Sequence, residues 1–408
     1  MSAFEAIRVS EHVLWVGAID WGLRDFHGYA THRGTTYNAY LILSDPITLV
    51  DTVKAGFKSE MLARIASAVE LSKVKAIISN HAEMDHSGSL PEVVRELQPA
   101  RILVSAQGKE ALERHFHWGR EVEVIREGER YDLGAGLSAR FVETPMLHWP
   151  DSMFTYLEED AVLFSNDAFG MHLASGARFA DQLEPELWRE EAARYYANIL
   201  MPLSPIVTKL LGRLAGLKLG PRIIAPDHGP VWRRHPENIV RLYGEWAAQV
   251  PTRKAVVVHD TMWKSTDRMA AAIGEGLSAR GMLVRQMPLS GAHRSDVATE
   301  LLEAGALLVG SPTINNQMFP TIADVLTYLK GLRPRNLVGA AFGSYGWGGQ
   351  AVGQIEEQLR ELKVDLVAEG LKLPYVPDEE GLARCRALGE QVAARMSERL
   401  EANARANG

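Results

Sequence analysis

The sequence of 408 residues contains a single cysteine, Cys385. One thiol cannot form a disulfide within the chain, and it cannot supply the ligands of a cysteine-based zinc site, an iron–sulfur cluster or a rubredoxin module. Its neighbours Leu382-Ala383-Arg384 and Ala387-Leu388 predict a helix. We therefore expect an inert thiol, and in-chain disulfide and cysteine-based metal chemistry are excluded.

The chain also lacks a strong charge of either sign and a long apolar run. Its formal net charge is −7, and Lys and Arg are scattered, which argues against nucleic acid as a partner. Residues 1–5 show no basic segment before an apolar core, and we expect no segment long enough to span a membrane. With ordinary hydrophobic and charged fractions of 46% and 23%, a cytoplasmic enzyme without a membrane partner is expected.

A chain of this length exceeds what one hydrophobic core usually supports, so two domains are expected. The composition changes near Val250-Pro251-Thr252, and beyond it predicted strands and helices alternate regularly. Such alternation predicts a doubly wound parallel sheet, with its ligand beyond the carboxyl ends of the strands. The expected domains are residues 1–250 and 251–408.

The predicted elements differ between the two halves of the chain. In the first half, short apolar runs separated by turns predict antiparallel strands in a sheet packed on a second layer, at residues 13–17, 37–43 and 47–51. A helix at 58–65 and a strand at 74–78 follow, and later runs at 101–104, 139–143, 161–165 and 222–226 each end in polar residues. In the second half, strands at 255–259, 283–286, 306–310, 337–342 and near 365–367 alternate with helices, the last beginning near residue 379.

Side chains able to bind metals gather in the stretch from Ser79 to Gly88, directly after the predicted strand 74–78. Histidines and carboxylates are costly to bury unpaired, and a metal pair is one of the few uses for so many in one turn. Three later strand ends carry more candidates. The predicted metal ligands are His81, Glu83, Asp85, His86, His148, Asp167 and His228. One zinc ion needs only three or four ligands, so this set favours two metals bridged by a carboxylate.

The spacing from His81 to His86 resembles the His-x-His-x-Asp-His signature of the metallo-β-lactamase fold, with Glu83 in place of the second histidine. That replacement is characteristic of the flavodiiron proteins, and both halves of the chain are similar to this family. The resemblance implies a metallo-β-lactamase-like αββα domain with two non-haem irons, followed by a flavodoxin-like domain with FMN. Carboxylates mixed with imidazoles also suit iron on chemical grounds, because a hard anionic ligand stabilises the ferric ion.

The same resemblance implies roles for single residues. His81, Glu83 and His148 bind one iron, Asp85, His86 and His228 bind the other, and Asp167 bridges them. Some members leave the position of His86 off the metal, so its role stays open. Three residues match positions that approach the metals in relatives, where they can donate hydrogen bonds to a bound substrate: His27, His172 and Tyr195. An ordinary structural role for each is the alternative.

A second set of candidates lies in three loops of the second half. The stretch Asp260 to Thr266 joins a strand to a helix, where hydroxyls and backbone N–H groups can hold a phosphate. It resembles a flavodoxin phosphate loop with Lys264 at a position often occupied by glycine, and the alternative is a plain helix cap. The other loops offer amides for the flavin edge and aromatic rings for stacking. The predicted FMN-binding residues are Thr261, Met262, Ser265, Thr266, Pro312, Thr313, Asn315, Asn316, Ser344, Tyr345, Gly346, Trp347 and Gly348.

The resemblance implies an oxidoreductase in which electrons pass from an external donor to FMN and then to two irons. The irons reduce dioxygen to water or nitric oxide to nitrous oxide. Because a fused rubredoxin is excluded, a separate rubredoxin or a reduced deazaflavin cofactor is the expected donor. Relatives bring the FMN of one subunit to the irons of another in a head-to-tail homodimer, and we expect such a dimer or a dimer of dimers here.

Two other functions compete with this one. A zinc hydrolase of the same amino-terminal fold is disfavoured by Glu83, and a flavin-carrying electron shuttle with a vestigial metal domain is disfavoured by the intact ligand set. The sequence leaves open the preference between dioxygen and nitric oxide, the identity of the donor and the choice between dimer and tetramer.

Overall fold

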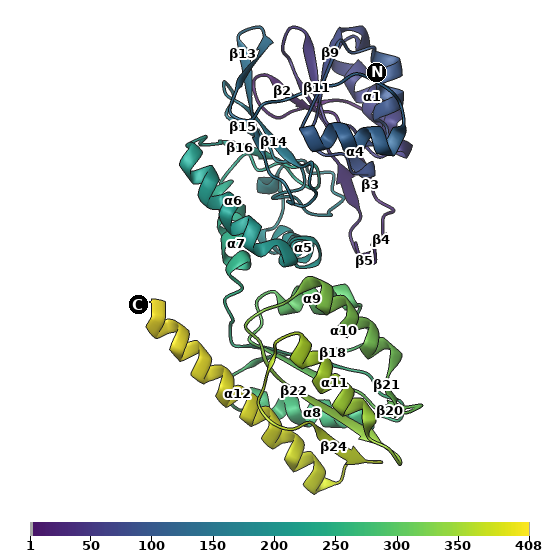
Figure 1. Ribbon diagram of the computed structural model, residues 1–408, viewed down its shortest axis with the longest axis vertical. Helices are drawn as coiled ribbons and strands as arrows, with labels where there is room; N and C mark the ends of the chain where they lie inside the picture. The colour runs from purple at the N-terminus through teal and green to yellow at the C-terminus, as the bar shows by residue number, and fades with distance from the viewer. Residues whose placement is uncertain (1–2, 408) are drawn as a thin grey trace. The chain divides into compact units, whose positions relative to one another are not determined.

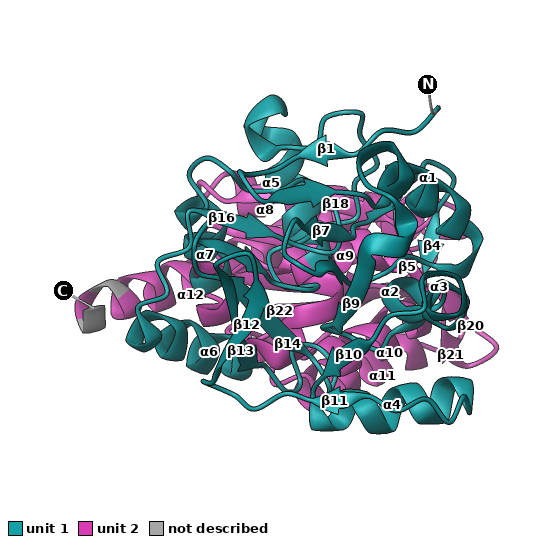
Figure 2. Ribbon diagram, turned by 90° about the horizontal axis from the view of Figure 1, so that it is seen from above, with its two compact units in different colours: residues 1–27, 31–195, 205–244 teal, residues 28–30, 196–204, 245–408 magenta. Residues whose placement is uncertain are grey.

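The computed structural model describes residues 3–407, and contacts along the chain divide it into two units (Figures 1 and 2). Unit 1 comprises residues 1–27, 31–195 and 205–244, and unit 2 comprises residues 28–30, 196–204 and 245–408. Two short early segments, 28–30 and 196–204, therefore group with the carboxyl-terminal part of the chain.

Unit 1 contains two large sheets. The order of the first is β1 (Ile7–Arg8), β2 (Val13–Trp15), β7 (Tyr40–Ile42), β8 (Ile47–Val50), β9 (Val74–Ser79), β10 (Arg101–Val104) and β11 (Glu123–Val124). Its strands are antiparallel up to the β7–β8 pair and parallel from β8 onward. The order of the second is β12 (Arg130–Gly134), β13 (Leu137–Glu143), β14 (Met153–Leu157), β15 (Val162–Phe164) and β16 (Ile223–Ala225), of which only the β15–β16 pair is parallel.

One predicted strand, residues 37–43, is wrong as a single element. It breaks into the end of β6 (Thr35–Tyr37), which pairs with β3 (Ala18–Asp20), and β7. The break has a physical reason at Asn38. Its buried amide donates to the carbonyls of Pro226 and Gly229 and its oxygen accepts from the Trp15 indole, so these long-range bonds hold the chain between the two strands.

Alternating side chains of the first sheet build two separate cores. One set packs against helices α1 (Lys58–Ala68), α3 (Leu90–Leu97) and α4 (Ala106–Phe116), and includes Leu41, Leu49 and Ile77. The other set packs against the second sheet, and includes Tyr40, Val50 and Ile78. These buried positions follow the period of two that a strand between two layers requires.

A further helical layer lies outside the second sheet. Phe154, on β14, contacts Phe169, and the Phe169 ring packs at 4.7 Å from that of Tyr243, on α7 (Glu237–Ala248). The layers are thus helix, sheet, sheet and helix, and the αββα arrangement expected for the amino-terminal half is confirmed.

Unit 2 is built around one parallel sheet. Its strand order is β18 (Leu283–Pro288), β17 (Lys254–His259), β19 (Ala306–Gly310) and β22 (Val338–Tyr345), with β23 (Asp365–Leu366) and β24 (Leu371–Pro374) both paired to β22. Helices α8 (Ser265–Ser278) and α12 (Glu379–Asn407) pack on one face, where Cys385 is fully buried. The other helices, α9 (Arg294–Leu301), α10 (Pro320–Leu332) and α11 (Gln350–Glu361), complete the doubly wound fold (Figure 1).

The sequence analysis missed strand β24. It has only four residues and ends in proline, a residue confined to sheet edges, so its run carries little strand signal of its own. Its place is set by pairing with β22 over Phe342 to Tyr345.

The helical run Pro185–Leu217 is long and apolar enough to cross a membrane by length and composition, so the expectation that no segment reaches that length is wrong. The run breaks into α5 (Pro185–Tyr195), a π-helical segment (Tyr196–Leu200), a 3-10 turn (Met201–Leu203) and α6 (Ser204–Leu217). A single run of this kind is weak evidence of a span, because core helices pass the same test.

Candidate active site

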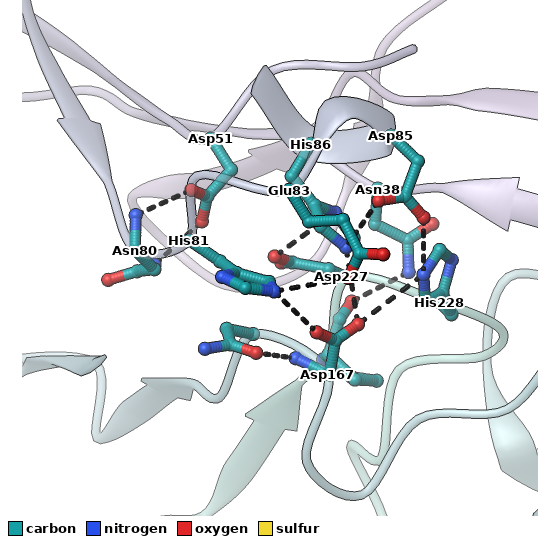
Figure 3. Close-up of polar contacts among 12 residues, drawn as sticks. Asn38, Asp51, Asn80, His81, Glu83, Asp85, His86, Asp167, Asp227 and His228 are labelled. Atoms are coloured by element: carbon teal, nitrogen blue, oxygen red, sulfur yellow. Dashed lines mark hydrogen bonds and ion pairs between the residues drawn. The ribbon is translucent and has the colours of Figure 1, made fainter. Parts of the chain in front are cut away.

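The stretch that follows β9 forms a loop and a one-turn helix, α2 (Met84–Ser87). Buried polar contacts fix this loop at its start. The backbone N–H and the side-chain amide of Asn80 donate to the two carboxylate oxygens of Asp51, at 2.6 and 2.7 Å. Two residues further on, the backbone N–H of Ala82 donates a hydrogen bond to the Asp151 carboxylate at 2.6 Å. A loop held this firmly can present several side chains in one direction (Figure 3).

All seven predicted metal ligands come together in unit 1, in two groups. The ligand atoms within each group lie within 4.8 Å of one another. The first group is His81, Glu83, His148 and Asp167, and the second is Asp85, His86 and His228. Each group has the ligand types and the spacing to hold one metal ion.

Asp167 lies between the two groups. Its Oδ2 is 3.4 Å from His81 Nε2 and 3.2 Å from His148 Nε2. Its Oδ1 is 3.2 Å from His86 Nε2 and 3.4 Å from His228 Nε2. One carboxylate therefore faces four imidazoles, and Figure 3 shows it with His81, His86 and His228. This is the position that a carboxylate bridging two metals must take.

These side chains are buried, and several of their polar atoms have no hydrogen-bond partner in the protein. Six of the seven residues are at most 6% exposed, and the His148 side chain is 14% exposed. Within residues 3–407, neither carboxylate oxygen of Asp85 and neither ring nitrogen of His86 has a hydrogen bond. Because unsatisfied buried polar groups are costly, their presence here fits a site that holds cations.

The acid–base behaviour of the site also fits a pair of cations. Burial alone lowers the pKa of His81, but hydrogen bonds with Asp151 and Glu83 outweigh burial and raise it to about 10. The pKa of His148 is raised to about 9 against the same opposing effect of burial, through Asp167 and Glu83. Without metal, protons on these imidazoles therefore balance the carboxylates. A ligand imidazole must give up such a proton, so metal ions would replace protons in this cluster.

The structure places the three residues predicted beside the metals close to predicted ligands. His27 is largely exposed and its Nε2 lies 3.2 Å from Glu83 Oε1. His172 is buried, and its Nδ1 lies 2.8 Å from the hydroxyl of Thr35, which is also 3.3 Å from His228 Nδ1. The buried Tyr195 ring packs edge-on against that of His172, 5.2 Å between centroids. Their roles in chemistry stay predictions.

The sequence analysis missed three buried aspartates that surround the two groups: Asp51, Asp151 and Asp227. Asp151 lies 3.1 Å from His81 Nδ1, and Asp227 lies 3.5 Å from His86 Nδ1. Metal-binding histidines usually direct their second nitrogen to such a group. Two of these aspartates could have been predicted from their proximity in sequence to a predicted ligand. Asp151 follows His148 by three residues, and Asp227 directly precedes His228.

A second site, in unit 2, is a cavity of about 800 Å³ at the carboxyl ends of the parallel strands. It lies where a doubly wound sheet binds its ligand. The lining residues include all but two of those predicted to bind FMN, and they are Met262, Trp263, Ser265, Pro312, Thr313, Ile314, Asn315, Asn316, Ser344, Tyr345, Gly346, Trp347, Gly348, Tyr375 and Val376. The lining carries no Asp, Glu, Lys or Arg, which suits a flat, uncharged ring system.

Thr261 and Thr266 are the two predicted residues outside this lining. Thr266 is buried, and its hydroxyl lies 2.9 Å from that of Ser344, so it ties the start of α8 to the end of β22. Trp263, Ile314, Tyr375 and Val376 line the cavity but were not predicted. Tyr375 and Val376 directly follow β24. Because the sequence analysis did not predict that strand, it did not predict the loop that follows it.

Backbone geometry explains two of the lining loops. Asn315 and Asn316 connect β20 (Thr313–Ile314) to β21 (Gln317–Met318) with φ of 50° and 60°. A two-residue hairpin with both φ values positive favours asparagine, and it directs this loop into the cavity wall. Lys264 has φ of 68° at the residue before α8, a left-handed conformation that glycine adopts more readily than other residues.

Comparisons with known proteins agree with this geometry. Residues 35–229 match the family model described as ODP family beta lactamase, and residues 257–389 match that of Flavodoxin. A nitric oxide reductase of Moorella thermoacetica is 45% identical over 398 residues, which cover 97% of this chain and 100% of that protein.

Two solved structures extend the similarity to the fold of the chain. A rubredoxin oxygen:oxidoreductase from Desulfovibrio gigas matches with a TM-score of 0.95 and 40% identity, covering 97% of this chain and 100% of the other. A flavodiiron protein from Giardia intestinalis matches with a TM-score of 0.95 and 32% identity, covering 99% of each chain. Similarity of this extent, through the metal groups and the cavity alike, shows that the chain belongs to the flavodiiron protein family.

Proposed function

We propose that this protein reduces dioxygen to water, nitric oxide to nitrous oxide, or both, at a diiron centre that receives electrons from FMN. The observation that carries the proposal is the pair of buried ligand groups joined by Asp167, with a carboxylate, Glu83, where a zinc hydrolase has histidine. Similar proteins support it, since one is named a nitric oxide reductase and another a rubredoxin-oxygen oxidoreductase.

The residues present fit the two irons. His81, Glu83 and His148 would hold one iron, Asp85, His86 and His228 the other, and Asp167 would bridge them. Two irons bound by these residues would supply redox chemistry for the reduction of a small gas. Glu83, Asp85 and Asp167 provide negative charge that favours the oxidised metals, and neighbouring histidines hold the pKa of the Asp167 carboxyl well below its usual range despite its burial.

The surrounding residues would control protons. Burial raises the pKa of Tyr195 well above its usual value, so its hydroxyl stays protonated and can donate a hydrogen bond. Burial and the neighbouring His228 hold the pKa of His172 well below its usual value, so its imidazole stays neutral. His27 is largely exposed, and its Nε2 lies 3.2 Å from Glu83 Oε1 at the edge of the site. We propose these three as the groups that orient the substrate, and unchanged turnover in Tyr195→Phe would remove Tyr195 from this role.

The residues lining the cavity of unit 2 fit FMN. Tyr345 and Trp347 offer aromatic faces to the flavin ring, and the amides of Asn315 and Asn316 offer hydrogen bonds to its polar edge. Ser265, the first residue of α8, would receive the phosphate at a helix amino terminus. FMN held by these residues would serve as a store of electrons for the metal site.

The proposal includes partners and location. We propose an iron domain at residues 1–250 and an FMN domain at 251–408, joined in a head-to-tail homodimer or dimer of dimers, in the cytoplasm. The donor would be a separate rubredoxin or a reduced deazaflavin cofactor. Analytical ultracentrifugation of the active protein tests the assembly, and a fully active monomer would contradict it.

One experiment tests the activity. The protein is loaded anaerobically with iron and FMN, its metals are counted by mass spectrometry, and consumption of dioxygen and of nitric oxide is followed with each donor. We expect two irons and one FMN per chain and turnover of at least one gas. Two zinc ions with ester or thioester hydrolysis, and no gas consumption, would establish the hydrolase instead.

A further inference from the structure

The loop from His148 to Asp151 supplies a predicted ligand and also holds another one in place. Asp151 Oδ2 lies 3.1 Å from His81 Nδ1 and accepts a 2.6 Å hydrogen bond from the Ala82 N–H. Trp149, in the same loop, packs edge-on against the His81 ring at 5.2 Å between centroids. The His81 imidazole is therefore held both through Nδ1 and through its ring contact with Trp149.

This arrangement sets which nitrogen of His81 faces the metal position. The Nδ1 faces a carboxylate, so Nδ1 carries the hydrogen and donates it. The opposite nitrogen, Nε2, lies 3.3 Å from Glu83 Oε2 and 3.4 Å from Asp167 Oδ2. A metal ion in the first ligand group would take the place of the proton on this nitrogen, while Nδ1 keeps its own.

Asp151 is itself immobilised. Asp151 is 3% exposed, and its backbone carbonyl accepts a 2.7 Å hydrogen bond from the hydroxyl of Ser105. Ser105 caps the amino terminus of α4, where its hydroxyl accepts the N–H of Gly108 at 2.9 Å. The carboxylate that orients His81 is thus anchored to a helix of the outer layer.

The histidines of the second ligand group have weaker partners. His86 Nδ1 lies 3.5 Å from Asp227 Oδ2, beyond a good hydrogen bond. His228 Nδ1 lies 2.6 Å from the backbone carbonyl of Thr36, which is neutral. Hydrogen bonds to a charged acceptor are roughly twice as strong as those between neutral groups, and they make the imidazole a better ligand. Of these three histidines, only His81 has such a bond.

We propose that Asp151 is a positioning residue that makes the group of His81, Glu83, His148 and Asp167 the tighter of the two metal positions. This group fills first and empties last as metal is added or removed. The inference rests on the proposed diiron site and concerns the unequal strength of its halves. Loss of an orienting partner of this kind weakens metal binding on the order of 10- to 100-fold.

The test titrates the full-length, metal-free protein with ferrous iron under anaerobic conditions against a competing chelator, which gives two dissociation constants. The wild-type protein is expected to bind in two separated steps. Asp151→Asn keeps an acceptor but removes the charge, and Asp151→Ala removes both. We expect the tighter step to weaken on the order of 10- to 100-fold, more in the alanine variant, while the weaker step stays unchanged.

Mössbauer spectra with one equivalent of ⁵⁷Fe measure how the iron divides between the two metal positions. A purely structural role of Asp151 would not change this division. Wild-type protein is expected to show one iron environment, whereas Asp151→Ala spreads the iron over two. Equal affinities in the wild-type protein, or an unchanged titration in both variants, would overturn the proposal.

The chain offers a matched control. Asp160 accepts hydrogen bonds from His12 Nδ1 at 2.7 Å and from a backbone N–H at 2.8 Å, as Asp151 does, but His12 is not a predicted ligand. Asp160→Asn must leave both iron steps unchanged. Equal weakening of both steps by the Asp151 variants, with a loss of thermal stability, would show a structural role and refute the inference. Wild-type protein that takes up zinc and no iron would contradict the proposed function, and the same titration with zinc would still decide the role of Asp151.

Discussion

Truncation of Trp347 to alanine separates a role in flavin binding from a role in folding. The Trp347 side chain lines the cavity of unit 2 but is 94% exposed, so it makes little contact with the rest of the protein. Substitutions at such surface positions change the free energy of unfolding by no more than about 0.5 kcal/mol. Any larger effect of Trp347→Ala must therefore appear in the complex with FMN.

The size of that effect follows from stacking. An aromatic side chain stacked on a nucleic-acid base contributes about 1–3 kcal/mol when tested by truncation to alanine, and the flavin is a larger ring system. Since about 1.4 kcal/mol is a tenfold change in affinity, Trp347→Ala should raise the Kd for FMN on the order of 10- to 100-fold.

The assay is quenching of FMN fluorescence on titration with flavin-free protein, alongside thermal unfolding of the same sample. Trp263→Ala removes a second exposed indole of the lining, 88% exposed, and should also raise the Kd. Trp21→Ala, at an indole of unit 1 that is 59% exposed, is the control and should leave the Kd unchanged. A Kd within twofold of wild type for Trp347→Ala would refute stacking on this ring.

Three further predictions concern the metal groups, the lone thiol and one partly buried ion pair. Asp167→Asn should empty both metal positions, because the carboxylate faces histidines of both groups, and mass spectrometry should find less than one iron per chain. Cys385 should resist alkylation at pH 8 until the protein unfolds, since burial raises its pKa to about 11, and peptide mass spectrometry checks this. The hydrogen bond with Asp160 raises the pKa of His12 above 6.5, so the stability it contributes is complete below pH 6.5 and is lost as pH rises through the raised value. His12→Asn should therefore destabilise the protein by about 0.5 kcal/mol at pH 6 and by less at pH 9 in thermal unfolding, because the ring is partly exposed.

Local sequence determined the elements of this protein and its densest cluster of ligands. The central strands of unit 2, β17, β19 and β22, are runs of buried apolar residues such as Ala255 to Val258. Their alternation with amphipathic helices predicts a parallel sheet without knowledge of long-range contacts. His81, Glu83, Asp85 and His86 lie within one loop, so their proximity follows from chain connectivity. His148, Asp167 and His228 were predicted because each follows a predicted strand and matches a family pattern.

Tertiary structure decided what surrounds these residues. Asp151 reaches His81 across 70 positions of sequence, and Asn38 breaks a predicted strand because its amide binds carbonyls near residue 228. Strand β24 exists because β22 has a free edge for it, and only then do Tyr375 and Val376 enter the cavity wall. The physical reason is that periodicity and spacing report the local backbone and the buried face of an element. Which acid orients which histidine depends on how distant loops pack, and that is fixed only when the sheets and helices are assembled.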